Sequence, residues 1–175
     1  MFFDIITLYP EYFHSFFHSG IMARNVRSGR ISYRIINLRS FGAGGYRRCD
    51  DMPFSGGPGM LISFNVLKDC WSRYLKNKKP LVFLSPRGQK LDAALARRLA
   101  GYKYLCLFCG HFEGFDQRFV QKYIHEEVSA GDYVLSGGET ASLTVMESIA
   151  RMLDSFCGNP QSLHEESFEN SLLEY

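Results

Sequence analysis

The chain has 175 residues, of which 46% are hydrophobic, and a net charge of +2, so its composition fits one well-packed domain. Its five cysteines are odd in number and show no repeated paired spacing, which excludes the disulfide framework of a small secreted protein. The first residues, MFFDIITLYPEYF, have no basic start and carry Asp4 within the apolar run, which excludes a signal peptide and a membrane span. We therefore expect a cytoplasmic protein without membrane association.

The first part of the chain predicts two strands and a helix before a long loop. The apolar run 2–8 predicts a buried strand, and Pro10 begins a short helix that ends before Gly20. Residues 31–38 alternate enough to predict a second strand. The glycine-rich segment 42–60 follows. Connections longer than about 15 residues without secondary structure are usually functional or disordered, and we interpret this one as functional.

The rest of the chain alternates helices with strands. Apolar spacing predicts, in chain order, a helix at 64–75, a strand at 81–84, a helix at 92–100, a strand at 104–109, and helices at 116–124 and 140–153. This alternation predicts an α/β fold with a mostly parallel sheet and helices on both faces. Ligands of such folds usually bind at the carboxyl ends of the strands. Here these ends are SPRGQK, GHFEGFD and GDYVLSGGE, and we expect them to converge.

Charge is distributed unevenly along the chain. Residues 24–48 contain seven arginines and no lysine or acid, whereas residues 152–175 contain five acids and no lysine or arginine. Arginine binds phosphate bidentately and stacks on bases, so the basic segment is typical of a nucleic-acid-binding face. On charge alone, a solvated surface is an equal alternative.

Several common motifs are missing or incomplete. The segment GAGGYR lacks the third glycine of the dinucleotide fingerprint, and no GK[ST] of a P-loop occurs. Cys106 and Cys109 form a C-x-x-C inside an apolar strand, which favours packed core thiols over redox catalysis. His14 and His18 have the spacing of a metal-binding pair but no third ligand nearby, which favours two half-exposed histidines. We therefore predict no resident metal site.

Glycines and polar residues gather after the last predicted strands. Glycine permits close backbone approach to a ligand and positive φ, although ordinary tight turns are the alternative. The glycines are Gly110, Gly114, Gly131, Gly137 and Gly138, and the polar residues between them are Glu113, Asp116, Arg118, Asp132, Tyr133, Ser136 and Glu139. This combination suits a ligand whose base and ribose are held by backbone groups.

Taken in order, the segments LYPEYF, DDMPFSGGPGM, LSPRGQKLD, CGHFEGFDQR and GDYVLSGGE closely resemble the bacterial tRNA (guanine-N1)-methyltransferases of the SPOUT class. The resemblance covers nearly the whole chain. It implies a deep trefoil knot in the carboxyl-terminal part of the α/β domain and a homodimer with its active site at the subunit interface. It also implies S-adenosylmethionine as methyl donor, with Mg²⁺ as a further candidate cofactor, and tRNA as partner. The acceptor would be N1 of the guanine at tRNA position 37, 3′ of the anticodon.

The resemblance also assigns roles to residues. Those expected at the methyl donor are Leu84, Pro86, Gly110, Glu113, Ala130, Gly131, Asp132, Tyr133, Val134, Leu135, Gly137 and Gly138. Those expected at tRNA are Asp50, Gly57, Gly59, Arg24 and Arg47. Methylation of guanine N1 needs a base for its proton and a cation for the charge that develops on O6. By position, Arg151 matches the catalytic arginine, and Glu166 falls where the family usually has an aspartate as general base.

The sequence departs from this family at several positions. Glu166 adds a methylene to the expected base, Phe112 stands in place of a tyrosine, and His111 stands where arginine is common. We expect residues 1–155 to form the donor-binding catalytic domain and 156–175 an interdomain linker that acts as a lid. The family's carboxyl-terminal tRNA-binding domain would then be absent, so we expect donor binding with impaired turnover. The alternatives are a non-catalytic RNA-binding module of the same fold and a knotted methyltransferase that acts on rRNA.

Overall fold

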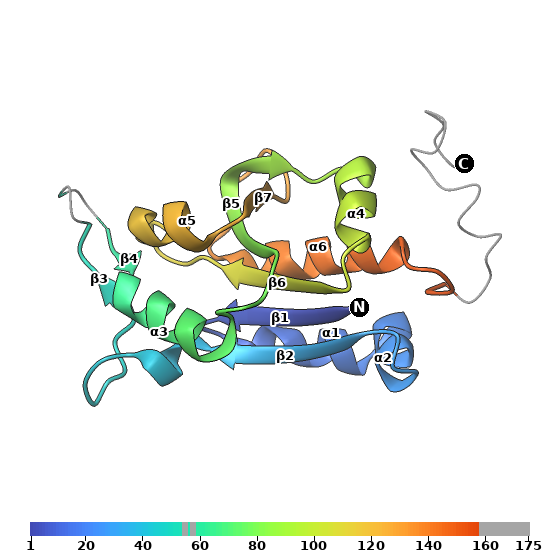
Figure 1. The fold of residues 1–175 in the computed structure, drawn as a ribbon, viewed down its shortest axis with the longest axis horizontal. Helices are drawn as coiled ribbons and strands as arrows, with labels where there is room; N and C mark the ends of the chain where they lie inside the picture. Colours follow the sequence, from blue (N-terminus) through green and yellow to red (C-terminus); the bar gives the residue numbers. More distant parts are fainter. Residues whose placement is uncertain (54–55, 57–58, 158–175) are drawn as a thin grey trace.

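The structure is a computed structural model that describes residues 1–53, 56 and 59–157. Its centre is a parallel sheet of five strands in the order β2-β1-β6-β5-β7 (Figure 1). These strands are β1 (Phe2–Thr7), β2 (Ser32–Asn37), β5 (Leu81–Lys90), β6 (Tyr104–Cys109) and β7 (Glu126–Ser129). Two short strands, β3 (Asp50–Asp51) and β4 (Leu61–Ile62), pair antiparallel at one end of the molecule.

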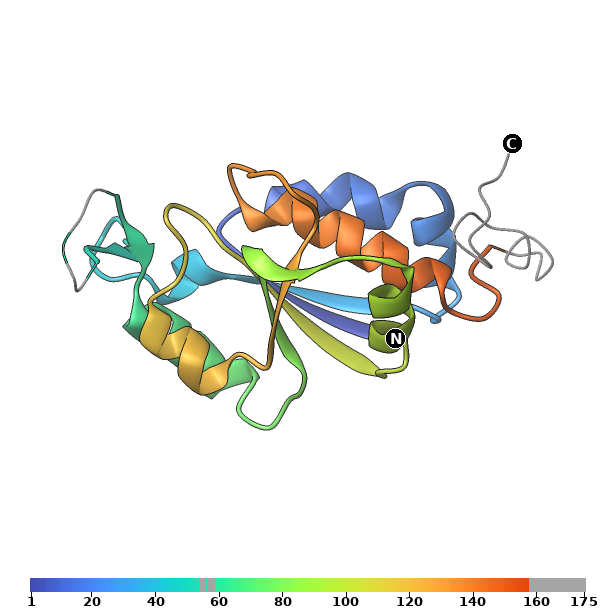
Figure 2. The ribbon, with the colours of Figure 1, turned by 90° about the horizontal axis from the view of Figure 1, so that it is seen from above.

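Helices cover both faces of the sheet. The described residues form six α-helices: α1 (His14–His18), α2 (Gly20–Arg27), α3 (Phe64–Tyr74), α4 (Ala93–Ala100), α5 (Gln117–Tyr123) and α6 (Gly138–Arg151). Short 3-10 helices at Pro10–Phe13 and Leu38–Phe41 follow β1 and β2. Figure 2 shows α1, α2 and α6 together on one side of the sheet. The mostly parallel α/β sandwich predicted from the sequence is therefore confirmed.

Alternating residues of the strands explain the two cores. Phe3 and Ile5 of β1 face the core that contains α1, α2, α4 and α6, whereas Ile6 faces the core that contains α3 and α5. β6 divides in the same way, with Leu107 in the first core and Phe108 in the second. Because both faces are covered, these strands are apolar almost throughout. Each such buried side chain stabilises the fold by about 1.5–3 kcal/mol.

Most element boundaries agree with the sequence predictions. The differences include β7 and the short β3 and β4, which were not predicted, as well as β5, α2 and α6. β5 continues to Lys90 instead of ending at 84, since its last residues pair with β7 again after a bulge. α2 was not predicted, because Gly20 at its start and its arginines obscure the apolar positions Met22 and Ala23. α6 begins and ends two residues before the predicted 140–153. The helices at 92–100 and 116–124 begin as predicted, since Asp92 and Asp116 cap them by accepting backbone hydrogen bonds.

The backbones of β5 and β7 approach each other closely beside a bulge. Leu84 and Gln89 of β5 both pair with Val128 of β7, so residues 85–88 form an excursion between them. Gly88 lies at this close approach, where a Cβ atom would stand 2.4 Å from the carbonyl carbon of Glu127. Only glycine lets two backbone segments pass at this distance.

A buried ion-pair network connects β1 to β2, to β6 and to the segment before β5. Asp4 of β1 has no exposed surface and accepts hydrogen bonds from Arg34 (two at 2.7 Å), Tyr104 (2.7 Å) and Lys78 (3.2 Å). Burial alone would raise the pKa of Asp4, but these hydrogen bonds outweigh it and lower the pKa. Arg34 of the basic segment therefore has a structural role.

The end of the described chain packs onto the domain. Phe156 is 2% exposed, and its carbonyl accepts a hydrogen bond from Asn25 Nδ2 at 3.2 Å. Phe156, which the sequence placed in the linker, is thus part of the first core. None of the helices in the described part of the chain has both the length and the apolar character needed to cross a membrane.

Candidate functional site

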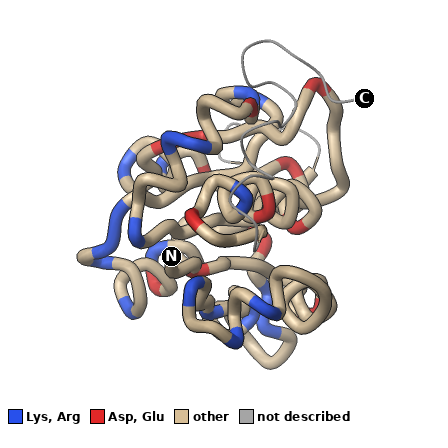
Figure 3. Tube along the Cα trace, turned by 90° about the vertical axis from the view of Figure 1, so that its right-hand side faces the viewer, with Lys and Arg blue, Asp and Glu red and all other residues tan. Residues whose placement is uncertain are grey.

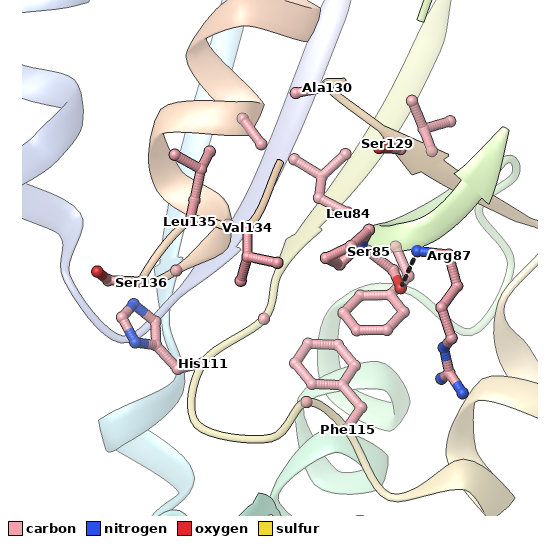
Figure 4. A pocket seen from close by; sticks show the side chains of 18 of the residues that line it. Leu84, Ser85, Arg87, His111, Phe115, Ser129, Ala130, Val134, Leu135 and Ser136 are labelled. Carbon is pink, nitrogen blue, oxygen red and sulfur yellow. Dashed lines mark hydrogen bonds between the residues drawn. The ribbon is translucent and has the colours of Figure 1, made fainter. Parts of the chain in front are cut away.

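A cavity of about 420 Å³ opens at the carboxyl edge of the sheet. Three segments line it: 83–87 from β5, 110–115 after β6, and 128–138 from β7 to the start of α6, with Ala141 of α6 beside them (Figure 4). These are the three strand ends that the sequence predicted to converge, and that prediction is confirmed. A volume of this size suits a ligand as large as a nucleoside derivative.

The floor of the cavity is apolar and the mouth is mixed. The Phe83 ring stacks on Phe115 at 4.3 Å, and both line the cavity. Arg87 lies at the edge, where its backbone N–H donates to Ser85 Oγ at 3.3 Å. Val134, which also lines the cavity, is 82% exposed. The site therefore offers apolar contact for a base and polar backbone groups for its edges.

The first residue of α6 is joined directly to the end of β6. The backbone N–H of Gly138 donates to the carbonyl of Gly110 at 2.8 Å. A Cβ atom on Gly138 would stand 2.7 Å from the Cα of Cys109, which leaves no room for a side chain. The glycines at these two positions therefore let the segments that line the cavity meet through their backbones.

A chain of hydrogen bonds connects three elements beside the cavity. Thr7 Oγ1, at the end of β1, donates to Glu139 Oε1 at 2.6 Å. Glu139 Oε2 lies 2.8 Å from Nε2 of His111, which follows β6. The backbone N–H of Tyr9 donates to Thr7 Oγ1 at 2.9 Å, and the Tyr9 ring lies 4.8 Å from the His111 ring.

The loop that contains β3 and β4 contacts the segment after β6. The backbone N–H of Glu113 donates to the carbonyl of Met60 at 2.9 Å. Gly59 has a φ of +93°, and a Cβ atom there would stand 2.4 Å from Cγ of Glu113. The expected tRNA-binding residue Gly59 therefore adjoins the expected donor-binding residue Glu113.

Most of the residues expected at the methyl donor line the cavity. They are Leu84, Pro86, Gly110, Glu113, Ala130, Tyr133, Val134, Leu135, Gly137 and Gly138. Gly131 and Asp132 are not among its lining residues. Asp132 instead points outward, where its carboxylate accepts a hydrogen bond from Lys90 Nζ at 2.6 Å.

The expected catalytic arginine is not brought to this cavity within one chain. Arg151 is the last residue of α6, and at 1.5 Å per residue the 14 residues of this helix place it roughly 20 Å from Gly138. Glu166 lies outside the described residues, as does Gly57 of the expected tRNA set. The cavity and Arg151 thus mark opposite ends of α6.

The other residues expected at tRNA are spread over the surface. Arg24 is exposed on α2. Figure 3 shows several Lys and Arg positions together in the lower part of the view. Arg47 is exposed beside Tyr46, and Asp50 lies in β3 with the Arg48 guanidinium 3.5 Å from its carboxylate. Among these described residues, Asp50 and Gly59 belong to the loop that contacts the cavity segments.

Several residues that line the cavity were given no role at the methyl donor from the sequence. Among them are Ser85, Arg87, His111, Phe112 and Ala141. Phe112 adopts a φ of +60°, which is uncommon for a bulky side chain and marks a constrained backbone. Ser85, Arg87, His111 and Phe112 lie inside the strand-end segments that the sequence marked, whereas Ala141 lies beyond them in α6.

The motifs set aside from the sequence are inert in the structure. Cys106 and Cys109 are free and fully buried, and burial raises the pKa of both thiols well above the ordinary value. They are packed core thiols, as expected. His14 and His18 are stacked and exposed. No three His, Cys, Asp or Glu side chains of the described residues come together to hold a metal ion.

Comparison with known proteins is consistent across the chain. A family model described as tRNA (Guanine-1)-methyltransferase TrmD matches residues 1–175. The tRNA (guanine-N(1)-)-methyltransferase of Pelagibacter ubique is 40% identical over 172 residues, which are 98% of this chain and 75% of the relative. The enzyme of the same name from Borrelia duttonii is 42% identical over 173 residues, covering 98% of this chain and 72% of its own. That of Magnetococcus marinus is 37% identical over 174 residues, covering 99% and 69%.

Proposed function

Because the chain belongs to the tRNA (guanine-N1)-methyltransferase family TrmD, we propose that its strand-end cavity binds the methyl donor and delivers the methyl group to guanine 37 of tRNA. Methylation of tRNA guanine N1 is the activity of this family, and a methyltransferase of the family implies S-adenosylmethionine as donor. The position of the guanine, the residues that hold each substrate and the subunit arrangement are parts of the proposal.

The observation that carries the donor site is the convergence of three strand ends on one cavity. The donor supplies an electrophilic methyl group on a cationic sulfur. Backbone groups of Gly110 and Leu135 would hold its adenine and ribose, since both segments reach the cavity through their backbones. The Glu113 carboxylate at the mouth would favour the cationic sulfonium. Ala130 leaves space on the opposite wall.

We further propose that the segments around the cavity form the trefoil knot expected for this family. Two close approaches between backbone segments support it: Gly88 against Glu127 and Val128, and Gly138 against Cys109. In such an arrangement the segment 128–138 would pass through the loop formed by the end of β5. A knotted loop would hold the cavity walls in place without flexible hinges. The bound methyl donor would therefore keep one position and orientation.

The distance along α6 supports a homodimer with a shared active site. Arg151 lies roughly 20 Å from the cavity of its own chain, so a second copy would supply this cation to the acceptor guanine. Several exposed apolar side chains lie near the cavity, and a second subunit that packs there would bury them. They are Tyr9, Tyr12, Phe112, Tyr133, Val134 and Leu135. Two-fold dimers are the commonest homo-oligomers.

In the proposed reaction, the methyl group moves from sulfur to guanine N1 while a base takes the N1 proton. The sulfonium becomes the neutral thioether of S-adenosylhomocysteine, so charge balances. Arg151 of the second subunit would stabilise the charge that develops on O6, and Glu166 would act as the base. The described residues do not group as a metal site, so no step is assigned to Mg²⁺.

A methyl-transfer assay tests this proposal. The protein is incubated with labelled S-adenosylmethionine and a tRNA transcript carrying guanine 37, and with matched transcripts that carry adenine 37 or an rRNA fragment. We expect N1-methylguanosine at position 37 by mass spectrometry of the digested tRNA and no product with the other two. Methylation of the rRNA fragment alone, or of another guanine, would contradict the proposal.

A further inference from the structure

We propose that Thr7, His111 and Glu139 form a positioning network that sets the width of the donor cavity. The proposal rests on the donor site assigned above and goes beyond it, because Thr7 and Glu139 do not line the cavity. Thr7 ends β1, His111 follows β6 and Glu139 lies in the first turn of α6. The network therefore ties together three elements whose ends surround the cavity.

Both oxygens of the Glu139 carboxylate are engaged. Oε1 accepts from the Thr7 hydroxyl at 2.6 Å, and Oε2 lies 2.8 Å from His111 Nε2. A carboxylate accepts hydrogen bonds, so the tautomer of His111 with a proton on Nε2 is the one that would donate to Glu139. Thr7 Oγ1 in turn accepts from the Tyr9 N–H at 2.9 Å. Both carboxylate oxygens of Glu139 and the Thr7 hydroxyl thus have hydrogen-bond partners.

Burial stabilises this arrangement. Glu139 is 2% exposed and Thr7 is fully buried, so water has little access to the hydrogen bond between them, whereas the His111 side chain, which lines the cavity, is 16% exposed. A buried carboxylate without hydrogen-bond donors is strongly disfavoured, whereas a paired one at the start of a helix also interacts favourably with the helix dipole. The positive end of α6 and the two donors therefore hold Glu139 in one position.

The network fixes a contact between two cavity walls. His111 forms a backbone bridge to Gly137, and a Cβ atom on Gly137 would stand 2.3 Å from His111 Nε2 and 2.7 Å from Glu139 Oε2. The imidazole and the carboxylate consequently pack directly on the Gly137 backbone. His111 and Gly137 both line the cavity, on the segments 110–115 and 128–138 (Figure 4). If the carboxylate shifts, the separation of these two walls shifts with it.

Binding of S-adenosylhomocysteine by isothermal titration calorimetry tests the proposal. Glu139→Gln keeps the shape but removes the charge, and Thr7→Val removes one donor. Loss of one partner of a buried hydrogen bond is expected to weaken binding by about 5- to 100-fold. Thr7→Ser keeps the hydroxyl and should restore binding to within about twofold of the unchanged protein. In methyl-transfer assays, the KM for S-adenosylmethionine should rise while the KM for tRNA stays constant.

The matched control is Asp4→Asn, which breaks the buried ion-pair network that connects β1, β2 and β6. It should lower the melting temperature as Glu139→Gln does, yet leave the Kd for S-adenosylhomocysteine within about twofold. If Glu139→Gln does not fold, the Thr7→Val and Thr7→Ser pair decides the question. Unchanged Kd in Thr7→Val and Glu139→Gln would overturn the network, whereas absence of binding by the unchanged protein would overturn the donor site itself.

Discussion

Replacing Gly138 with alanine should separate the two segments that close the cavity. The added Cβ would lie 2.7 Å from both the Cα of Cys109 and the backbone nitrogen of Gly110, whereas ordinary contacts begin at 3.4 Å. The neighbours are backbone atoms, so α6 and the end of β6 must move apart by roughly 1 Å. Overpacking of this kind costs about 1–3 kcal/mol. Stretching the Gly138 to Gly110 hydrogen bond adds about 1 kcal/mol.

The sum of about 2–4 kcal/mol lowers the melting temperature by about 5–15 °C in a chain of this size. A displacement of about 1 Å at the cavity wall should also weaken S-adenosylhomocysteine binding by up to about 10²-fold. Calorimetric unfolding and titration measure both effects. Gly45→Ala is the matched control, because nothing lies within 4 Å of its added Cβ. It should change stability by less than about 0.5 kcal/mol. A Gly138→Ala protein that melts and binds like the Gly45→Ala protein would refute the reasoning.

Four further predictions follow from the same structure. Asp4→Asn should cost about 1.5–3 kcal/mol at neutral pH, because Asp4 accepts hydrogen bonds from two cations. The lowered pKa of Asp4 makes its contribution complete above its ordinary value of 3.8 and lost as the pH falls through the lowered value, so the stability difference between the two proteins should shrink below about pH 4 in urea titrations. Arg151→Ala should reduce kcat by about 10²-fold or more with donor Kd unchanged. In an equal mixture of Arg151→Ala and Gly138→Ala chains, about half of the dimers would be mixed, and each mixed dimer would have one intact site if the active site is shared between subunits. The mixture should then show on the order of a quarter of the normal rate, and absence of recovery would contradict a shared site. Arg47→Ala should raise the KM for tRNA and reduce its salt dependence by about one phosphate contact, with donor Kd as the unaffected control. In the native protein a thiol reagent should modify Cys157 first, since the four other cysteines are buried; rapid reaction of all five would contradict the packing.

The sequence predicted most of the fold because local patterns define its elements. The apolar run 104–109, closed by Gly110, became β6 with the same limits. The helix caps Asp92 and Asp116 were visible as acids before apolar periodic segments. α2 was missed because its exposed arginines interrupt the pattern of a helix that is held by tertiary packing, chiefly against α1. Local propensity cannot report that packing.

The loops that line the candidate site were predictable from the sequence, but the long-range contacts that hold these loops in place were not. Glycines and polar residues at strand ends marked the segments that line the cavity, since parallel strands end at a common edge. The pairing of Thr7 with Glu139 spans 132 positions, and nothing in either local segment indicates it. The return of β5 to β7 after residues 85–88 depends on a bulge that alternation does not reveal. The reason that Arg151 is far from the cavity lies in the length of α6. Its use by a second subunit therefore stays a prediction.

A crystal structure with S-adenosylhomocysteine tests the central claim most directly. The account predicts the ligand in the cavity between segments 83–87, 110–115 and 128–138, with its adenine against the backbone of Gly110 and Leu135 and its sulfur facing the mouth near Glu113. Density for the ligand at another site, with this cavity unchanged, would contradict the account.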